Sequence, residues 1–291
     1  MISGYCIGIK NNFAELTFAQ EFKKVFLRLL LPYFVWSLIY IILSDKLVSI
    51  KYYLATFTLR GLAPLWFLAT LAMCEICFFT TLKIIKKRKE KQGLLIFILI
   101  GAICLALGFA MQVIKTELDL STDTMTTAGY YLYVSVGRLF ISIPSYILGY
   151  LLVKTGFLKR VNKVASFVIG ALLLAIVAIL VAVFNLKTNC HLFYTSNYLL
   201  FIITSFAGAA GILLISRCIE NFGMGLSFIG QNSLGLMILH YPPFKTISYT
   251  SNAVAHLWSN ENFISISATV ITTAITLGFI YLVKKKFFLF K

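Results

Sequence analysis

The stretch GLLIFILIGAICLALGFAMQVI, residues 93–114, decides the fold. It contains 22 residues and no charged side chain. At a rise of about 1.5 Å per residue, a helix of this length crosses the roughly 30 Å apolar core of a bilayer. Because a backbone in lipid must satisfy its own polar groups, such a run predicts a transmembrane helix.

Seven further runs have the same character along the chain. They are Val25–Ser44, Ala63–Leu82, Gly129–Val153, Val164–Leu186, Tyr198–Ser216, Ser227–Thr246 and Phe263–Val283. Hydrophobic residues make up 60% of the 291 residues and charged residues only 12%, and the mean hydropathy is +0.91. Soluble domains carry about twice that share of charge. We therefore predict an all-α polytopic membrane helix bundle of about eight transmembrane helices, with residues 1–291 forming one integral membrane domain.

The basic residues give the orientation. The net charge is +16, but the lysines and arginines lie mostly in short loops between apolar runs, which argues against a nucleic-acid partner. With the N-terminus inside, 19 of the 26 lysines and arginines fall in cytoplasmic segments and 6 on the opposite side, with Arg138 inside a span. This asymmetry follows the positive-inside rule and places both termini in the cytoplasm.

Three ionisable residues interrupt predicted spans, namely Glu75, Arg138 and His240. Burying such a group in the membrane costs a few kcal/mol even on lenient scales, so each needs a reason. Helix rise places all three near the midplane or the outer half of the bilayer. One interpretation is a polar cavity inside the bundle. The other is a buried Arg138–Glu75 pair that fixes helix packing.

The segment FIGQNSLGLMILHYPPF, residues 228–244, carries the histidine. Ser233 and His240 lie seven residues apart on one helix stripe, and Pro242 and Pro243 leave two carbonyl groups beside His240 without a donor. A neutral histidine in such surroundings can act as a base or donor. Alternatively, His240 packs across helices, with Asn232 and Ser233 joining helices by hydrogen bonds. The loop histidines His191 and His256 are interpreted as solvated surface residues.

Two residues near the predicted membrane boundaries complete the candidate set. Arg28 opens the first span and either anchors its cytoplasmic end or binds an anion. Trp66 lies at interface depth, where an aromatic belt also explains it. The sequence contains no phosphate-binding glycine loop, no HExxH, no metal cluster and no GxSxG elbow.

Four segments in order resemble the acyltransferase 3 family of integral membrane O-acyltransferases. They are RLLLPYFVW (28–36), PLWFLATL (64–71), GRLFISIPSYILGYLL (137–152) and IGQNSLGLMILHYP (229–242). The resemblance implies transfer of an acyl group, commonly acetyl, from cytoplasmic acetyl-CoA or another acyl-CoA to a hydroxyl. The acceptor it implies is a cell-surface or exported carbohydrate, and the location is the bacterial cytoplasmic membrane. It implies no bound cofactor and no metal.

The resemblance also suggests roles for individual residues. Arg28 matches the basic residue near the donor entrance, Arg138 and Pro144 match the middle-span pattern, and Ser233 and His240 match the late segment. We therefore predict His240, Ser233 and Arg138 as catalytic residues. The predicted substrate- or donor-binding residues are Arg28, Trp66, Glu75 and Asn232.

The start of the chain departs from the family pattern. ISGYCIG, residues 2–8, resembles the cytoplasmic end of the family's second span. We therefore expect an N-terminally truncated domain that lacks the first span, with its usual catalytic histidine, and most of the second. Two alternatives remain open at this point. One is an inactive truncated acyltransferase, and the other is a transporter or flippase of a polar or sugar-lipid substrate.

Overall fold

The computed structural model describes most of the chain, and the described part is almost wholly helical. The described residues are 1–9, 16–44, 46–62, 64–86, 88, 90–121, 123, 125–156, 161–218, 223–239, 246–255 and 261–284. Among them the only strands are the two-residue β1 (Thr188–Asn189) and β2 (Tyr194–Thr195), which pair antiparallel around the short helix η3 (Cys190–Leu192). The prediction of an all-α polytopic bundle is confirmed.

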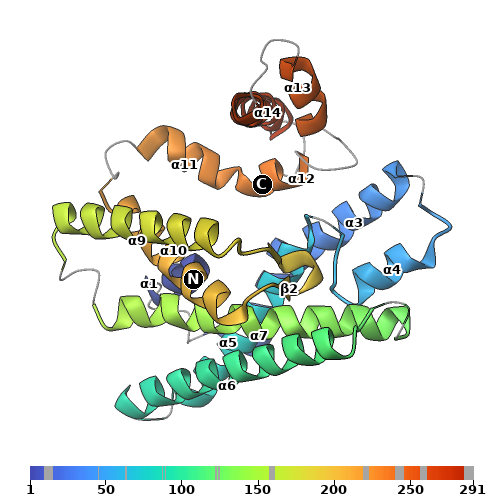
Figure 1. Cartoon of the computed structure of the whole chain (residues 1–291). Coiled ribbons are helices and arrows are strands. Elements are labelled where there is room, and N and C mark those ends of the chain that lie inside the picture. Colours follow the sequence, from blue (N-terminus) through green and yellow to red (C-terminus); the bar gives the residue numbers. More distant parts are fainter. Residues whose placement is uncertain are drawn as a thin grey trace.

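Seven helices in the described ranges are long and apolar enough to cross a membrane. They are the continuous helix α2–η2–α3 (Phe18–Val25, Phe26–Leu30, Leu31–Leu43), α5 (Trp66–Ile85), α6 (Glu90–Glu117), α7 (Thr127–Lys154), α9 (Lys163–Val183), α10 (Tyr198–Ser216) and α14 (Glu261–Lys284). The shorter helices are α1 (Ile2–Ile9), α4 (Ile50–Phe57), α11 (Gly223–Gln231), α12 (Ser233–Leu239) and α13 (Thr246–Ala255). Figure 1 shows α6 and α7 on one side of the bundle, α9 and α10 in the middle, and α11 to α14 on the other side.

The first membrane helix begins earlier than predicted. It starts at Phe18 rather than Val25, because Thr17 and Gln20 form a capping box. The Gln20 N–H donates to the Thr17 hydroxyl at 3.2 Å, and the Thr17 N–H donates to the Gln20 side-chain oxygen at 2.8 Å. These bonds satisfy two backbone donors at the helix start. The helix therefore carries a polar first part that hydropathy alone does not identify as part of a span.

A π-helical turn joins this polar part to the apolar part of the same helix. Pro32 has no N–H to donate to the carbonyl of Arg28, so the regular ladder is interrupted there. The turn Phe26–Leu30 adjusts to this, and the Leu31 N–H donates to the carbonyl of Phe26. Such turns inside α-helices are frequent at functional sites. Arg28 lies within this turn.

The predicted span Ser227–Thr246 is not one helix. α11 ends at Gln231 and α12 begins at Ser233, with a turn at Asn232 between them. The Asn232 side-chain amide donates to the carbonyl of Phe228 at 2.7 Å, and the same carbonyl also accepts the Asn232 backbone N–H at 3.2 Å. His240, Pro242 and Pro243 lie outside the described residues. In the described part, this segment therefore contributes two short helices.

α1 packs against α7 at unusually close range. Gly4 and Gly8 lie four residues apart on α1, the spacing of a small-residue helix contact. A Cβ on Gly4 would overlap the backbone carbonyl of Tyr146, and one on Gly149 would overlap that of Met1. Only glycine permits this approach of the two backbones. The contact fixes α1 on the same helix that carries Arg138.

One hydrophobic cluster joins α3 and α5 to α12 and α14. Its fully buried members include Tyr33, Leu65, Ile238 and Ile280. The Tyr40 hydroxyl donates to the carbonyl of Ile238, a residue far along the chain. These contacts hold α12 beside the first membrane helix, which positions the walls of the candidate site.

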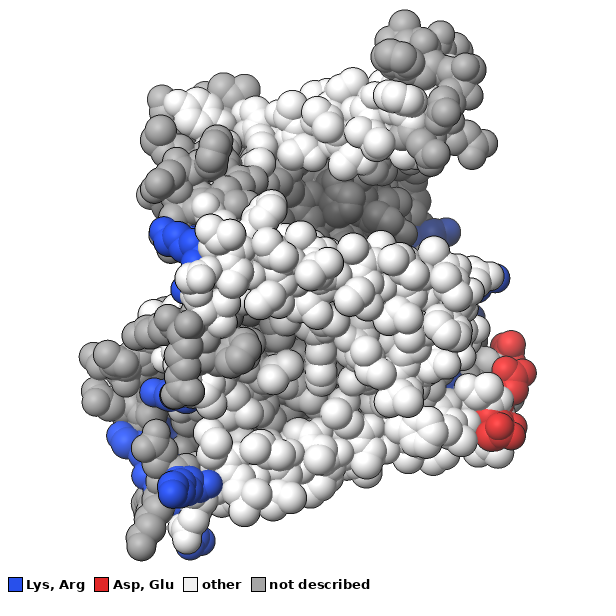
Figure 2. Space-filling model, turned by 60° about the vertical axis from the view of Figure 1, so that its left-hand side comes forward, with Lys and Arg blue, Asp and Glu red and all other residues white. Residues whose placement is uncertain are grey.

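The surface suits a lipid environment. α9 and α10 pack together through Gly170 and Gly211, while many of their large apolar side chains are exposed. Figure 2 shows a broad uncharged surface, with lysine and arginine gathered mainly at one end and aspartate and glutamate at the other. This separation agrees with the orientation that the positive-inside rule predicts.

Candidate functional site

A cavity of about 660 Å³ lies between the first membrane helix and the helices α11, α12 and α14. Its lining residues are Gln20, Lys23, Lys24, Leu27, Arg28, Leu31, Pro32, Val35, Gln231, Asn232, Leu234, Gly235, Ile238 and Ile280. The volume is within the usual range of small-molecule and cofactor sites. The cavity therefore has room for a ligand much larger than an acetyl group.

The lining is polar at one end and apolar at the other. Lys23, Lys24 and Arg28 come from α2 and η2, at the end of the bundle that the charge pattern assigns to the cytoplasm. Further along the same helix Leu31 and Val35 follow, and α12 adds further apolar side chains opposite them. Such a site attracts an anionic group at its mouth and an apolar group in its interior.

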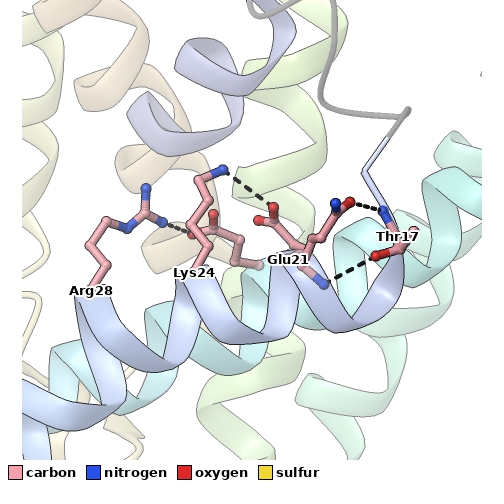
Figure 3. A network of polar contacts seen from close by, with 6 residues as sticks. Thr17, Glu21, Lys24 and Arg28 are labelled. Atoms are coloured by element: carbon pink, nitrogen blue, oxygen red, sulfur yellow. Dashed lines mark hydrogen bonds and ion pairs between the residues drawn. The ribbon is translucent and has the colours of Figure 1, made fainter.

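Two buried carboxylates pair with two of these cations, Lys24 and Arg28 (Figure 3). Arg28 forms an ion pair with Glu75 of α5, and Lys24 pairs with Glu21 at 3.2 Å. Glu75 and Glu21 are 2% and 1% exposed, whereas the side chains of Arg28 and Lys24 are 46% and 38% exposed. The carboxylates therefore stand behind the cavity wall and the cations stand in it. A buried carboxylate needs such a partner because desolvation otherwise costs several kcal/mol.

The alternative in which Arg138 pairs with Glu75 is wrong. Glu75 forms its ion pair with Arg28. The acidic residue close to Glu75 is Glu21, which acts on it electrostatically. Sequence reasoning missed Glu21 altogether. A signal was available, because Glu21, Lys24 and Arg28 lie three and four residues apart and so share one helix face.

The opposite wall contains part of the late segment that the sequence singled out. Asn232 is buried at the turn between α11 and α12 and lines the cavity, as Gln231 does. Ser233 follows directly, but its side chain is exposed and is not among the lining residues. His240 lies outside the described residues, so its catalytic role stays a prediction. Arg28 and Asn232 are thus brought to one cavity, with Glu75 behind it.

Arg138 lies in a different cluster, with Trp66. Its guanidinium is buried and donates to the carbonyls of Leu59 at 3.3 Å and Arg60 at 2.7 Å. It also donates to the carbonyl of Val134 at 3.3 Å. The Trp66 ring lies 5.3 Å from its central carbon, within the range of a cation–π contact. In the described part of the chain, the polar residues expected in one cavity therefore lie in two places. Arg28 and Asn232 line the cavity, and Arg138 lies with Trp66 in a separate cluster.

The segment that Arg138 holds connects α4 to α5 and has irregular backbone. Leu59 and Gly61 have φ angles of 58° and 72°, a conformation that is unfavourable for leucine. Backbone polar groups that are shielded from water must find hydrogen-bond partners inside the protein. Arg138 supplies several of them, so its observed contacts are those of a positioning residue.

His191 belongs to this second cluster, which sequence reasoning did not anticipate. Its Nε2 lies 3.2 Å from the carbonyl of Gly61, and the ring is partly buried. Burial lowers the pKa of His191 to about 4, and the positive charges of Arg60 and Arg138 act in the same direction. Nothing in the local sequence signals a contact between residues so distant in the chain. The interpretation of His191 as a solvated surface residue is wrong.

Comparison with known proteins gives one family match. A family model of the acyltransferase 3 type, described as an acyltransferase domain, matches residues 1–285. Neither the curated proteins nor the solved structures give a match. The matched residues include the cavity lining, the cluster around Arg138 and every described membrane helix up to Lys284.

Proposed function

Since the chain belongs to the acyltransferase 3 family and is a multi-pass membrane acyltransferase, we propose that it transfers an acyl group from a cytoplasmic acyl-CoA to a hydroxyl of a cell-surface or exported carbohydrate. The acyl group we favour is acetyl, and the membrane is the bacterial cytoplasmic membrane. The observation that carries this proposal is the cavity with a cationic mouth and an apolar interior.

The cavity suits the chemistry of an acyl-CoA. The phosphate groups of CoA are anionic, and Lys23, Lys24 and Arg28 stand together at the cavity mouth. Charge-assisted hydrogen bonds from such residues to phosphate are about twice as strong as neutral ones. The pantetheine arm and the acyl group would extend along the apolar side chains toward Asn232. The thioester would then lie along the apolar part of the lining, beside Asn232.

The reaction needs few groups. The acceptor oxygen attacks the thioester carbonyl carbon, its proton passes to a base, the carbon–sulfur bond breaks and the CoA thiolate leaves and is protonated. Hydrogen-bond donors must stabilise the negative oxygen of the intermediate. Our candidate for the base is His240, which follows α12 directly in sequence. Asn232, buried in the cavity wall, is our candidate for positioning the thioester.

CoA binding tests the donor site. We expect the double variant Arg28→Gln/Glu75→Gln, which removes one charge of each sign and so leaves no unpaired carboxylate at position 75, to bind CoA about tenfold more weakly or worse. That loss corresponds to one charge-assisted contact of about 1.5–3 kcal/mol. Lys86→Gln is the control for a general loss of positive charge, because Lys86 is an exposed lysine at the same end of the bundle outside the cavity lining. Equal CoA affinity in the double variant and the wild type would exclude this donor site.

Transfer to an acceptor tests the chemistry separately. Purified protein in nanodiscs is given radiolabelled acetyl-CoA and a panel of carbohydrates, and labelled product is counted. His240→Ala should retain CoA binding and lose transfer. Transfer at the wild-type rate would show that His240 is not the base.

A further inference from the structure

The cluster around Arg138 contains two buried donors that the acyl-donor cavity does not use. In the described part of the chain, Nη1 of Arg138 and Nε of Arg60 are both buried without a hydrogen-bond partner. Arg138 is 1% exposed, and Arg60 is close enough to act on it electrostatically. Buried polar atoms normally find partners, so two unpaired donors in one cluster indicate a place where acceptors bind.

Among the described residues, no carboxylate pairs with the positive charges of this cluster. The ion pairs in the described ranges join Lys24 to Glu21 and Arg28 to Glu75, and neither involves Arg60 or Arg138. Instead the two guanidinium groups contact aromatic rings, with Arg60 4.3 Å from the ring centre of Tyr131 and Arg138 5.3 Å from that of Trp66. Like charges buried near each other raise the free energy of the folded state, because a low dielectric strengthens their repulsion. A bound anion would reverse this effect.

The position of the cluster suits a ligand that arrives from the outer side. Arg60 is only partly buried and follows α4, in the connection that the charge pattern assigns to the outside. His191 of the outer loop between α9 and α10 contacts the neighbouring Gly61. The cluster thus lies toward the side of the bundle opposite the mouth of the acyl-donor cavity.

We propose that Arg60 and Arg138 form an oxyanion site in the outer half of the bundle that holds a phosphate or carboxylate group of the acceptor. This inference rests on the proposed function, because it gives the carbohydrate acceptor an acidic substituent. Nη1 of Arg138 and Nε of Arg60 donate to the oxyanion, while the other Arg138 nitrogens keep their bonds to the backbone carbonyls. The site orients the acceptor so that its hydroxyl enters the bundle from outside.

Trp66 provides the measurement, because its ring lies against Arg138. Inorganic phosphate is titrated into the protein in nanodiscs of zwitterionic lipid, and tryptophan fluorescence is recorded. We expect a saturable change that Trp66→Phe abolishes. Arg60→Gln should weaken the apparent phosphate affinity about tenfold or more, as loss of one charge-assisted contact predicts. Arg60 is the residue to change because its side chain does not hold backbone carbonyls, as that of Arg138 does.

Lys51→Gln is the matched control. Lys51 is an exposed cation of α4 on the same side of the membrane, so a general loss of positive charge would weaken binding equally in both variants. Unchanged affinity in Arg60→Gln, equal losses in the two variants, or no phosphate response in the wild type would each overturn the proposal.

Two further measurements complete the test. The first distinguishes a lipid from the acceptor as the source of the oxyanion, and the second distinguishes failure of the oxyanion site from failure of the acyl-donor site. Adding an anionic phospholipid to the nanodiscs tests for a lipid phosphate. If it blocks the phosphate response, the site stands but its occupant is a lipid headgroup; if it does not, the acceptor assignment stands. CoA binding is measured on the same samples. If the wild-type protein binds CoA but gives no phosphate response, the oxyanion site alone is overturned. If the wild-type protein binds phosphate but not CoA, the donor site alone is overturned.

Discussion

Glu75 and Arg28 form an ion pair in which the carboxylate is buried and the guanidinium is almost half exposed. The pair joins α5 to the π-helical turn of the first membrane helix. Its two members therefore differ in what their loss leaves behind. Without Arg28 a carboxylate stays buried and unpaired, whereas without Glu75 the arginine still reaches the cavity and its solvent.

This asymmetry predicts unequal losses of stability. Arg28→Ala should lower the free energy of unfolding by about 3–5 kcal/mol, the range for an uncompensated buried charge. Glu75→Gln should lower it by less, about 1.5–3 kcal/mol, the cost of a lost hydrogen bond to a charged group. Thermal unfolding of the purified variants in detergent measures the order. Arg28→Gln/Glu75→Gln should be more stable than Arg28→Ala, and the reverse order would contradict the pairing.

Arg138→Lys should release the connection between α4 and α5. A lysine keeps the charge, but a single ammonium cannot reach the carbonyls of Leu59, Arg60 and Val134 together. We expect a loss of about 2–4 kcal/mol, since several bonds to buried groups are broken. The direct readout is the rate of trypsin cleavage after Arg60, which should rise.

Arg28→Lys serves as the comparison for that experiment. It makes the same chemical change in the other cluster and should leave cleavage after Arg60 at the wild-type rate. Equal cleavage rates in Arg138→Lys and the wild type would mean that Arg138 does not hold this segment.

Stability should depend on pH through His191. Its pKa is about 4 in the folded protein and 6.5 when unperturbed. Between these values the unfolded chain binds a proton that the folded chain does not, so stability falls as the pH is lowered from about 6.5 toward 4. Above pH 6.5 this contribution is constant. Because the ring is partly exposed, we expect an effect on the order of 1–2 kcal/mol.

The measurement is the difference between the pH profiles of the wild type and His191→Gln. Glutamine cannot titrate, so subtracting its profile removes the contribution of the carboxylates. A difference that does not change between pH 7 and pH 4 would contradict the burial of His191.

Gly4→Ala should detach α1 from α7. The new Cβ would overlap the backbone carbonyl of Tyr146, and backbone cannot move aside as a side chain can. Overpacking of this kind typically costs about 1–3 kcal/mol. Gly278→Ala on α14 is the control, because a Cβ there meets no atom within 4 Å. The control should be neutral or slightly stabilising, and equal melting temperatures for both variants would disprove the close contact.

The membrane helices were largely predictable because length and hydropathy are local properties. The predicted limits failed where other forces act. The first helix begins at Phe18 because of its capping box. The late segment divides at Asn232, whose side-chain amide and backbone N–H both donate to the carbonyl of Phe228. Both signals are written in the sequence, but neither affects an average over an apolar window.

The candidate site was less predictable because contacts between distant segments decide it. Arg28 and Asn232 were expected to bind substrate or donor, and both line the cavity. Burial cost explains why Glu75 needs a partner, but it does not say which of two arginines provides it. The choice of Arg28 depends on the packing of α5 against η2, and the sequence does not contain that geometry in readable form.

The π-helical turn has a consequence for the angular arrangement of the cavity wall. The cavity residues of the first membrane helix form two rows with four-residue steps, 20–24–28–32 and 23–27–31–35. In a regular α-helix each step of four residues overshoots a full turn by about 40°, so such a row would rotate by about 120° over its length. The wider turn at Phe26–Leu30 takes up part of this rotation. One continuous helix can therefore direct both its cations and its apolar side chains into the same cavity.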